Sequence, residues 1–195
     1  MAQAGTGPAN GPDGFAPKAH PHLSLGRHPR LRSRNRKGLK ARPIPMPQSL
    51  SLIIIHVIFS TKERRPFLDA DTRSGLHAYL ATVGRNAGCE AYRVGGVADH
   101  VHLAIRLART ITVANLVETL KTSSSKWVKT RSPDLARFSW QRGYGCFSVG
   151  PSDLEALRVY IDDQEKHHRT RTFQDEFRMF LKKYDIEYDE AYVWD

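Results

Sequence analysis

The chain has 195 residues, of which 40% are hydrophobic, and a formal net charge of +10. This length and composition suit one compact domain with a hydrophobic core, and they exclude a membrane span: the longest apolar run, residues 52–59, is far shorter than the roughly 20 residues that a spanning helix needs. Two cysteines without a CxxC motif exclude a disulfide framework, and with no signal-peptide pattern we expect a cytoplasmic protein.

Most of the positive charge lies in residues 1–45. Nine basic residues and one acidic residue give this segment a charge of +8, which leaves +2 for residues 46–195. Its Gly, Pro, Ala and Arg content and its lack of periodicity predict a disordered tail. The tail is either a basic arm that binds phosphates or upstream sequence read from a wrong start codon. Met46, directly before a well-patterned domain, favours the second reading.

The domain over residues 46–195 is predicted to begin with a strand and a helix. Residues 52–59 (LIIIHVIF) are a β-branched run bounded by polar residues, typical of a central strand. A helix follows, capped by Asp69 or Asp71 and ending near Gly88. Its apolar positions recur at helical spacing: Leu76, Tyr79, Leu80 and Val83.

Two strands and a second helix come next. Residues 90–94 and 101–107 are predicted strands joined around Gly95 and Gly96, and Thr112 is predicted to open the helix. The apolar side of this helix consists of Ala114, Leu116, Val117, Leu120 and Trp127.

The C-terminal part is predicted to hold one strand and two helices. The strand runs from near Ser139 to Val149. A helix over residues 152–168 begins with a capping box made by Ser152 and Glu155, and residues 173–184 form the last helix.

The element order β-α-β-β-α-β, followed by C-terminal helices, predicts the α+β class with a ferredoxin-like arrangement. One antiparallel sheet would carry helices packed on one face, and we expect the other face to be free for a ligand.

Two histidines stand on one predicted strand. In the segment Asp99-His100-Val101-His102-Leu103, side chains alternate, so His100 and His102 project from one face while Val101 and Leu103 face the helices. Two adjacent imidazoles on a sheet face suit a metal site, although the pair alone is more often a solvated surface pair.

Tyr160 and Gln164 are the second candidate pair. At positions i and i+4 of a helix they share a face. A tyrosine in such a place is more often a half-buried packing residue. His167 and His168 follow one turn later as alternative ligands or as cations at the helix C-terminus, and the second interpretation is favoured.

Together these segments resemble the HUH single-tyrosine transposases, the family of insertion-sequence 200-like and REP-associated tyrosine transposases. The resemblance covers about residues 46–195, and the strongest part is HVH followed some 58 residues later by YxxxQ. The matching segments are IIIHVIFSTKERRPF, GGVADHVHL, KTSSSKWVK, FSWQRGYGCFSV, VYIDDQEKHH and IEYDEAYVWD.

The resemblance implies a function and a set of roles. His100, His102 and Gln164 match the ligands of a divalent metal, Mg²⁺ or Mn²⁺, and Tyr160 matches the nucleophile. The implied activity is cleavage and rejoining of hairpin-containing single-stranded DNA through a 5′-phosphotyrosine, as in DNA transposition. The family also implies a homodimer in which the helix bearing Tyr160 docks on the partner's histidine pair.

Basic and aromatic residues near the predicted site are candidate DNA contacts. Each cation is suited to a phosphate, and Trp140 or Tyr144 is suited to stack on an unpaired base, unless both pack in the core. The candidate cations are Lys62, Arg64, Arg65, Lys121, Lys126 and Arg142.

Two other functions compete with the transposase. One is a nucleic-acid-binding ferredoxin-like module without catalysis, but its strand would carry stacking aromatics where this chain has histidines. The other is a metal hydrolase in which His100 and His102 hold a water-activating metal.

Overall fold

The computed structural model describes residues 49–194, which contain one four-stranded sheet. The strands are β1 (Ile54–Ser60), β2 (Glu90–Gly96), β3 (His100–Arg106) and β4 (Gly145–Val149). They pair in the order β2-β3-β1-β4, and every pairing is antiparallel. The predicted α+β, ferredoxin-like arrangement is confirmed. The tail predicted for residues 1–45 lies outside the described residues.

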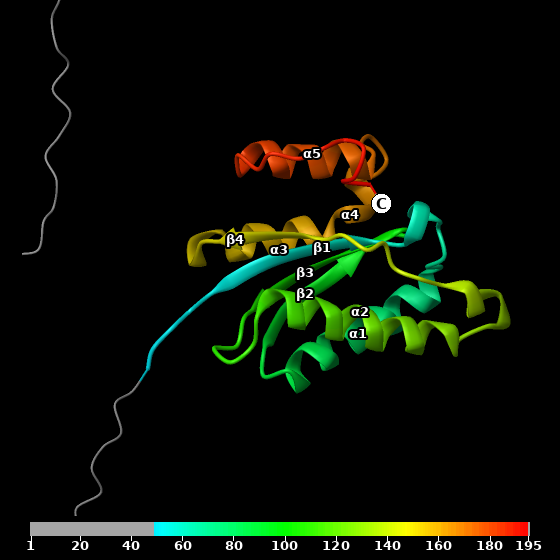
Figure 1. Cartoon of the computed structure of the whole chain (residues 1–195), viewed down its shortest axis with the longest axis horizontal. Helices are drawn as coiled ribbons and strands as arrows, with labels where there is room; N and C mark the ends of the chain where they lie inside the picture. Colours follow the sequence, from blue (N-terminus) through cyan, green and yellow to red (C-terminus); the bar gives the residue numbers. More distant parts are fainter. Residues whose placement is uncertain (1–48, 195) are drawn as a thin grey trace, which may run out of the picture. The chain divides into compact units, whose positions relative to one another are not determined.

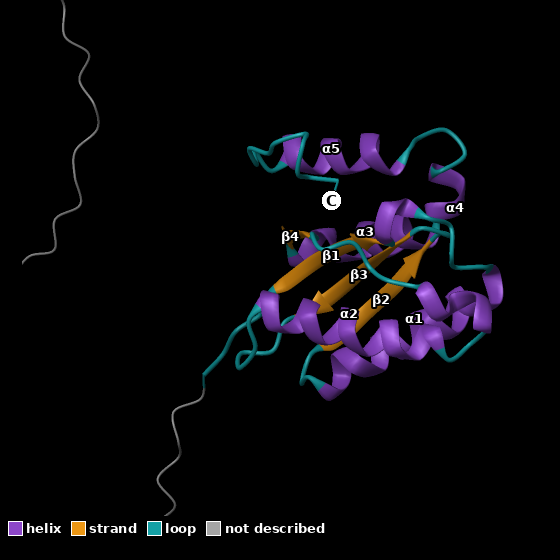
Figure 2. Cartoon of the chain, turned by 45° about the vertical axis from the view of Figure 1, so that its right-hand side comes forward, coloured by secondary structure: helices purple, strands orange, loops and turns teal. Residues whose placement is uncertain are grey.

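Helices cover both faces of the sheet (Figures 1 and 2). On one side lie α1 (Ala70–Asn86) and α2 (Val113–Lys129). On the other lie α3 (Leu154–Asp162), α4 (Gln164–His167) and α5 (Phe173–Lys183). The expectation of a face free for a ligand was therefore wrong. Within the described part of the chain, no helix has the length and apolar character needed to cross a membrane.

The central strand β1 explains why the second face is covered. All seven of its residues are buried, so its sequence is a nearly continuous apolar run and lacks the alternation of a half-exposed strand. The main core, which includes Val57, Leu103 and Leu120, fills the α1/α2 side. A smaller core on the other side joins Ile58 and Phe147 to the apolar residues of α5. Burying both faces of β1 therefore requires the C-terminal helices.

Side-chain caps begin three of the helices. Asp69 accepts a hydrogen bond from the Thr72 amide, which settles the choice between Asp69 and Asp71 as the cap of α1. Thr112 caps α2 as predicted, and Thr172 caps α5.

Two element boundaries differ from the prediction. The fourth strand begins at Gly145, because residues 139–144 form a loop that meets the end of β1 through an isolated bridge between Thr61 and Trp140 and through hydrogen bonds between Gln141 and Ser60. The helix predicted over residues 152–168 is interrupted at Asp163, whose ψ of 10° departs from helical geometry. Ser152 lies in a 3₁₀ turn before α3 and does not cap it. The interruption separates the helix that carries Tyr160 from the turn that carries Gln164.

A glycine lets α3 approach the sheet. A Cβ at Gly95 would lie 2.6 Å from the side chain of Ile161 and 2.8 Å from its carbonyl oxygen. Beside this contact Arg93 pairs with Asp162, with Nη2 2.6 Å from Oδ2. The close contact at Gly95 and this ion pair hold α3 against β2.

We expect Gly95→Ala to lower the free energy of unfolding by about 2 kcal/mol, because the new methyl group overlaps the backbone of α3. Chemical denaturation measures this change. Gly84→Ala is the matched control: no atom lies within 4 Å of its added Cβ, so it should stabilise α1 by about 0.5–1 kcal/mol. Equal stability of Gly95→Ala and wild type would contradict the packing argument.

Candidate active site

The two predicted histidines lie side by side on β3 and point toward the C-terminal helices. Both side chains are fully buried, and their ring centroids are 5.0 Å apart. They share this face because strand side chains alternate, as the sequence predicted. They do not lie on a solvated surface, so the interpretation of a solvated pair is wrong.

His100 is oriented by its neighbour Asp99. The Nδ1 atom of His100 lies 2.7 Å from Oδ1 of Asp99. Burial raises the pKa of Asp99, but the hydrogen bond from His100 and the nearby charges of His100 and His168 together outweigh it, so the net pKa is lowered and the carboxylate is charged. With Nδ1 of His100 held by Asp99, the other ring nitrogen, Nε2, faces Gln164 and Glu176. A carboxylate behind a histidine in this way is the usual outer partner of a metal-binding imidazole.

His102 is oriented by His56 of β1. Nδ1 of His102 lies 2.9 Å from Nε2 of His56, and the two rings stack. Burial lowers the pKa of His56 to about 3 and that of His102 well below its usual value, so both rings are neutral at pH 7. The remaining nitrogen of His102, Nε2, is buried and has no hydrogen-bond partner among the described residues.

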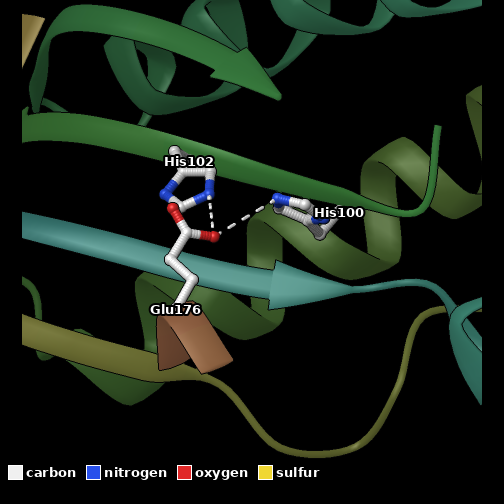
Figure 3. Close-up of side chains that lie close together, drawn as sticks. All are labelled: His100, His102 and Glu176. Atoms are coloured by element: carbon white, nitrogen blue, oxygen red, sulfur yellow. Dashed lines mark ion pairs between the residues drawn. The ribbon is translucent and has the colours of Figure 1, made fainter. Parts of the chain in front are cut away.

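A carboxylate from α5 completes the cluster. Oε2 of Glu176 lies 3.8 Å from Nε2 of His100 and 3.7 Å from Nε2 of His102 (Figure 3). Burial raises the pKa of Glu176 to about 8, and the negative charge of nearby Asp99 adds to the effect. The sequence prediction missed this residue. A signal existed: Glu176 lies on the apolar stripe formed by Phe173, Phe177 and Leu181, where a solvated glutamate would not be expected.

Gln164 joins the two halves of the cluster. Its Oε1 lies 3.3 Å from Nε2 of His100, and its Nε2 donates to Oε1 of Glu176 at 3.0 Å. The side chain is 1% exposed. His168 lies on the same side, with Nε2 3.1 Å from both Gln164 and Glu176. His168 lies at the C-terminal end of α4, where burial lowers its pKa, so a neutral ring that contacts Gln164 and Glu176 is favoured over the helix-terminal cation suggested by the sequence.

The cluster brings together several nitrogen and oxygen atoms that can bind a metal. His100, His102 and Glu176 each offer a ligand atom, and these atoms lie within 4.8 Å of one another. The Oε1 atom of Gln164 points to the same place. The buried, unpartnered Nε2 of His102 is the atom that a cation would satisfy. The residues present therefore fit a divalent metal.

Tyr160 lies beside this cluster in the same chain. Its ring centroid is 5.9 Å from that of His102 and 5.0 Å from that of His167. Its hydroxyl is buried, and no hydrogen-bond partner for it occurs in the part of the chain that the structure describes. The fold thus places the ring of Tyr160 beside that of His102, and no hydrogen bond within the described residues uses its hydroxyl.

The predicted DNA contacts divide between two places. Lys62, Arg64 and Arg65 lie at the end of β1, where exposed Arg65 pairs with Glu63. Lys126 and Arg142 line a groove of about 580 Å³ between α2 and the 139–144 loop.

Lys121 and Trp140 instead make hydrogen bonds within the chain. The Nζ atom of Lys121 donates to three carbonyl oxygens, those of Gln141 at 2.8 Å, Arg142 at 3.1 Å and Gly143 at 2.5 Å. Trp140 is 8% exposed and donates to Oγ of Ser124, so it packs in the core. Tyr144 is 41% exposed and keeps the stacking role open.

Comparison with known proteins identifies the family. The family model described as "Transposase IS200 like" matches residues 49–164. The ISDra2 transposase TnpA of Deinococcus radiodurans is 24% identical over 114 residues, which are 56% of this chain and 81% of that protein.

Two solved structures are similar to part of this chain. A crystal structure of a protein assigned as a transposase from Deinococcus radiodurans R1 has 22% identity and a TM-score of 0.48, over 64% of this chain and 96% of that one. A REP-associated tyrosine transposase bound to a REP hairpin has 15% identity and a TM-score of 0.47, over 63% and 74%.

The class of protein follows from the family match. The family model covers more than half of the chain. The matched residues 49–164 include the four-stranded sheet, the buried histidine pair and Tyr160. The chain belongs to the IS200-like transposase family, whose members are enzymes that cleave and rejoin DNA.

Glu176 makes the stability of the metal-free protein depend on pH. Its folded pKa of about 8 exceeds the ordinary value of 4.5, so the stability that it contributes is present below pH 4.5 and is lost as the pH rises toward 8. Relative to Glu176→Gln, metal-free wild type should lose about 2 kcal/mol between pH 6 and pH 8. Denaturation in chelator at both pH values measures the difference. Exposed Glu187→Gln should show no such change.

Proposed function

We propose that this transposase is a metal-dependent endonuclease and strand transferase that acts on hairpin-containing single-stranded DNA, with Tyr160 as its nucleophile. The observation that carries the proposal is the buried Tyr160 hydroxyl, unpaired within the described residues, next to the convergent lone pairs of His100, His102 and Glu176. The choice of hairpin DNA rests on family membership and on the motifs HVH and YxxxQ.

The proposed metal ligands are His100, His102 and Gln164, with Glu176 as a fourth ligand in the DNA-free protein. When bound, a divalent ion supplies Lewis-acid polarisation of a non-bridging phosphate oxygen. Two imidazoles and two oxygen donors suit Mn²⁺ better than Mg²⁺, although both ions fit the family. Asp99 and His56 are positioning residues, because each holds one imidazole through its Nδ1 atom.

Tyr160 would attack the scissile phosphorus. A bond forms between the phenolic oxygen and phosphorus, the bond to the 3′ oxygen breaks, the phenol loses its proton and the 3′ oxygen gains one. The DNA 5′ end is then held as a phosphotyrosine. Because this ester retains the bond energy, attack by a 3′-hydroxyl reverses the step and rejoins DNA without a nucleotide cofactor.

Access to the site sets a further requirement. Both histidines are fully buried beneath the C-terminal helices. A DNA phosphate therefore reaches them only after α5 shifts. The homodimer with exchanged helices and the cytoplasmic location remain predictions; in the single chain, Tyr160 already lies beside its own histidines.

Tyr160→Phe should abolish a covalent protein–DNA adduct while leaving the fold intact. The adduct is measured on denaturing gels with Mn²⁺ and a set of synthetic hairpin-containing single strands drawn from the DNA that flanks the gene. Exposed Tyr188→Phe is the control and should form the adduct at the wild-type level. Cleavage that persists in Tyr160→Phe without an adduct would favour the hydrolase, and DNA binding without cleavage by wild type would favour the non-catalytic module.

Glu176→Ala should weaken Mn²⁺ binding by about tenfold, because it removes one ligand and the partner that orients Gln164. Electron paramagnetic resonance of free Mn²⁺ measures the affinity without any DNA. His102→Ala should bind still more weakly, and exposed Glu187→Ala should bind like wild type. Wild-type affinity in Glu176→Ala would remove Glu176 from the ligand set.

A further inference from the structure

A cationic groove lies outside the tyrosine and histidine cluster. It runs between α2 and the 139–144 loop and has a volume of about 580 Å³. Its lining holds four basic side chains and one acidic side chain, although residues 46–195 as a whole carry only +2. The basic residues are Lys121, Lys126, Lys129 and Arg142, and the acidic residue is Glu118.

The wall of the groove is held in place by Lys121. Its ammonium group donates hydrogen bonds to three consecutive carbonyl oxygens, from Gln141 to Gly143. These bonds fix the loop that carries Arg142 and Tyr144. Burial lowers the pKa of Lys121 to about 8, so its side chain is still charged at pH 7. Lys121 is thus a positioning residue. The exposed cations that remain for a ligand are Lys126, Lys129 and Arg142.

The groove leads toward the histidine end of the sheet. Its residues Ser139, Trp140, Gln141 and Arg142 also line a second hollow of about 390 Å³, which reaches Lys62. The Gln141 amide donates to the carbonyl of Ser60, and the two side chains are also hydrogen-bonded. Ser60 is the residue of β1 that pairs with His100. One strand pairing therefore separates the end of this path from the first metal ligand.

We propose that this groove binds an unpaired DNA strand, with phosphates on Lys126, Lys129 and Arg142 and a base stacked on Tyr144. The charge of the lining selects a polyanion, and the exposed ring of Tyr144 offers a stacking surface. Only an unpaired base can use that surface, because the bases of a duplex are already stacked on one another. The inference rests on the proposed function in naming DNA as the ligand.

The test is binding of fluorescent oligothymidylate, twenty nucleotides long, to the full chain in chelator, measured by anisotropy at several salt concentrations. The double variant Lys126→Ala/Lys129→Ala should raise Kd about tenfold and lower the salt slope by about 1.4, since each phosphate contact on a single strand contributes about 0.7. The control Arg85→Ala/Arg109→Ala removes the same charge from two exposed residues, and its Kd should stay within about twofold of wild type.

The stacking contact has its own test. Tyr144→Ala should weaken oligothymidylate binding about fivefold, and Tyr144→Phe should restore it, because stacking needs the ring and not the hydroxyl. Binding of a blunt twelve-base-pair duplex should change less than binding of the single strand in every groove variant. Wild-type affinity in the double lysine variant, or equal losses for strand and duplex, would overturn the proposal.

The two proposals fail separately. Oligothymidylate binding in chelator involves no cleavage, so it tests the groove residues without the nucleophile. The comparison of adduct formation between wild type and Tyr160→Phe leaves every groove residue unchanged, so it tests the nucleophile without the groove.

Discussion

The convergence of nitrogen and oxygen lone pairs on one buried point is the constraint on which the rest of this structure depends. His100, His102, Gln164 and Glu176 come from three separate elements, and each turns a nitrogen or oxygen atom toward the same point. Within the described residues, Nε2 of His102 is buried there without a hydrogen-bond partner. Buried polar groups in this state destabilise a fold unless something else satisfies them. A divalent cation does so, and the surrounding sheet and helices hold the ligands ready for it.

The orientation of those lone pairs depends on a layer of neighbours. Asp99 accepts a hydrogen bond from Nδ1 of His100, and Glu176 accepts one from Nε2 of Gln164. Nδ1 of His102 is hydrogen-bonded to His56. Each of these contacts directs the free donor atom of a ligand toward the same point. A change in any of them would rotate or reprotonate a ligand without removing it.

The two faces of β1 have different roles, one in the main core and the other beside the histidine cluster. One face packs on α1 and α2 and forms the main core, whereas the other carries His56 and the small core that docks α5. The loop over residues 139–144 passes from the helix layer to the end of β1, and Lys121 fixes its path. The loop therefore connects the groove beside α2 with the end of β1 that pairs with His100. The groove and Tyr160 lie on opposite faces of the sheet.

The sequence by itself determined the order of strands and helices along the chain, the histidine pair and the Tyr160–Gln164 spacing, because alternation and helical period are local properties of the backbone. Tertiary structure alone decided that the histidine face is buried, that Lys121 of α2 bonds the 139–144 loop, and that Glu176 and His168 join the cluster. These contacts link residues far apart in the chain, or depend on how three helices pack, and local patterns do not specify such distances. Glu176 is the partial exception, since its place on an apolar helix stripe already marked it as a buried carboxylate.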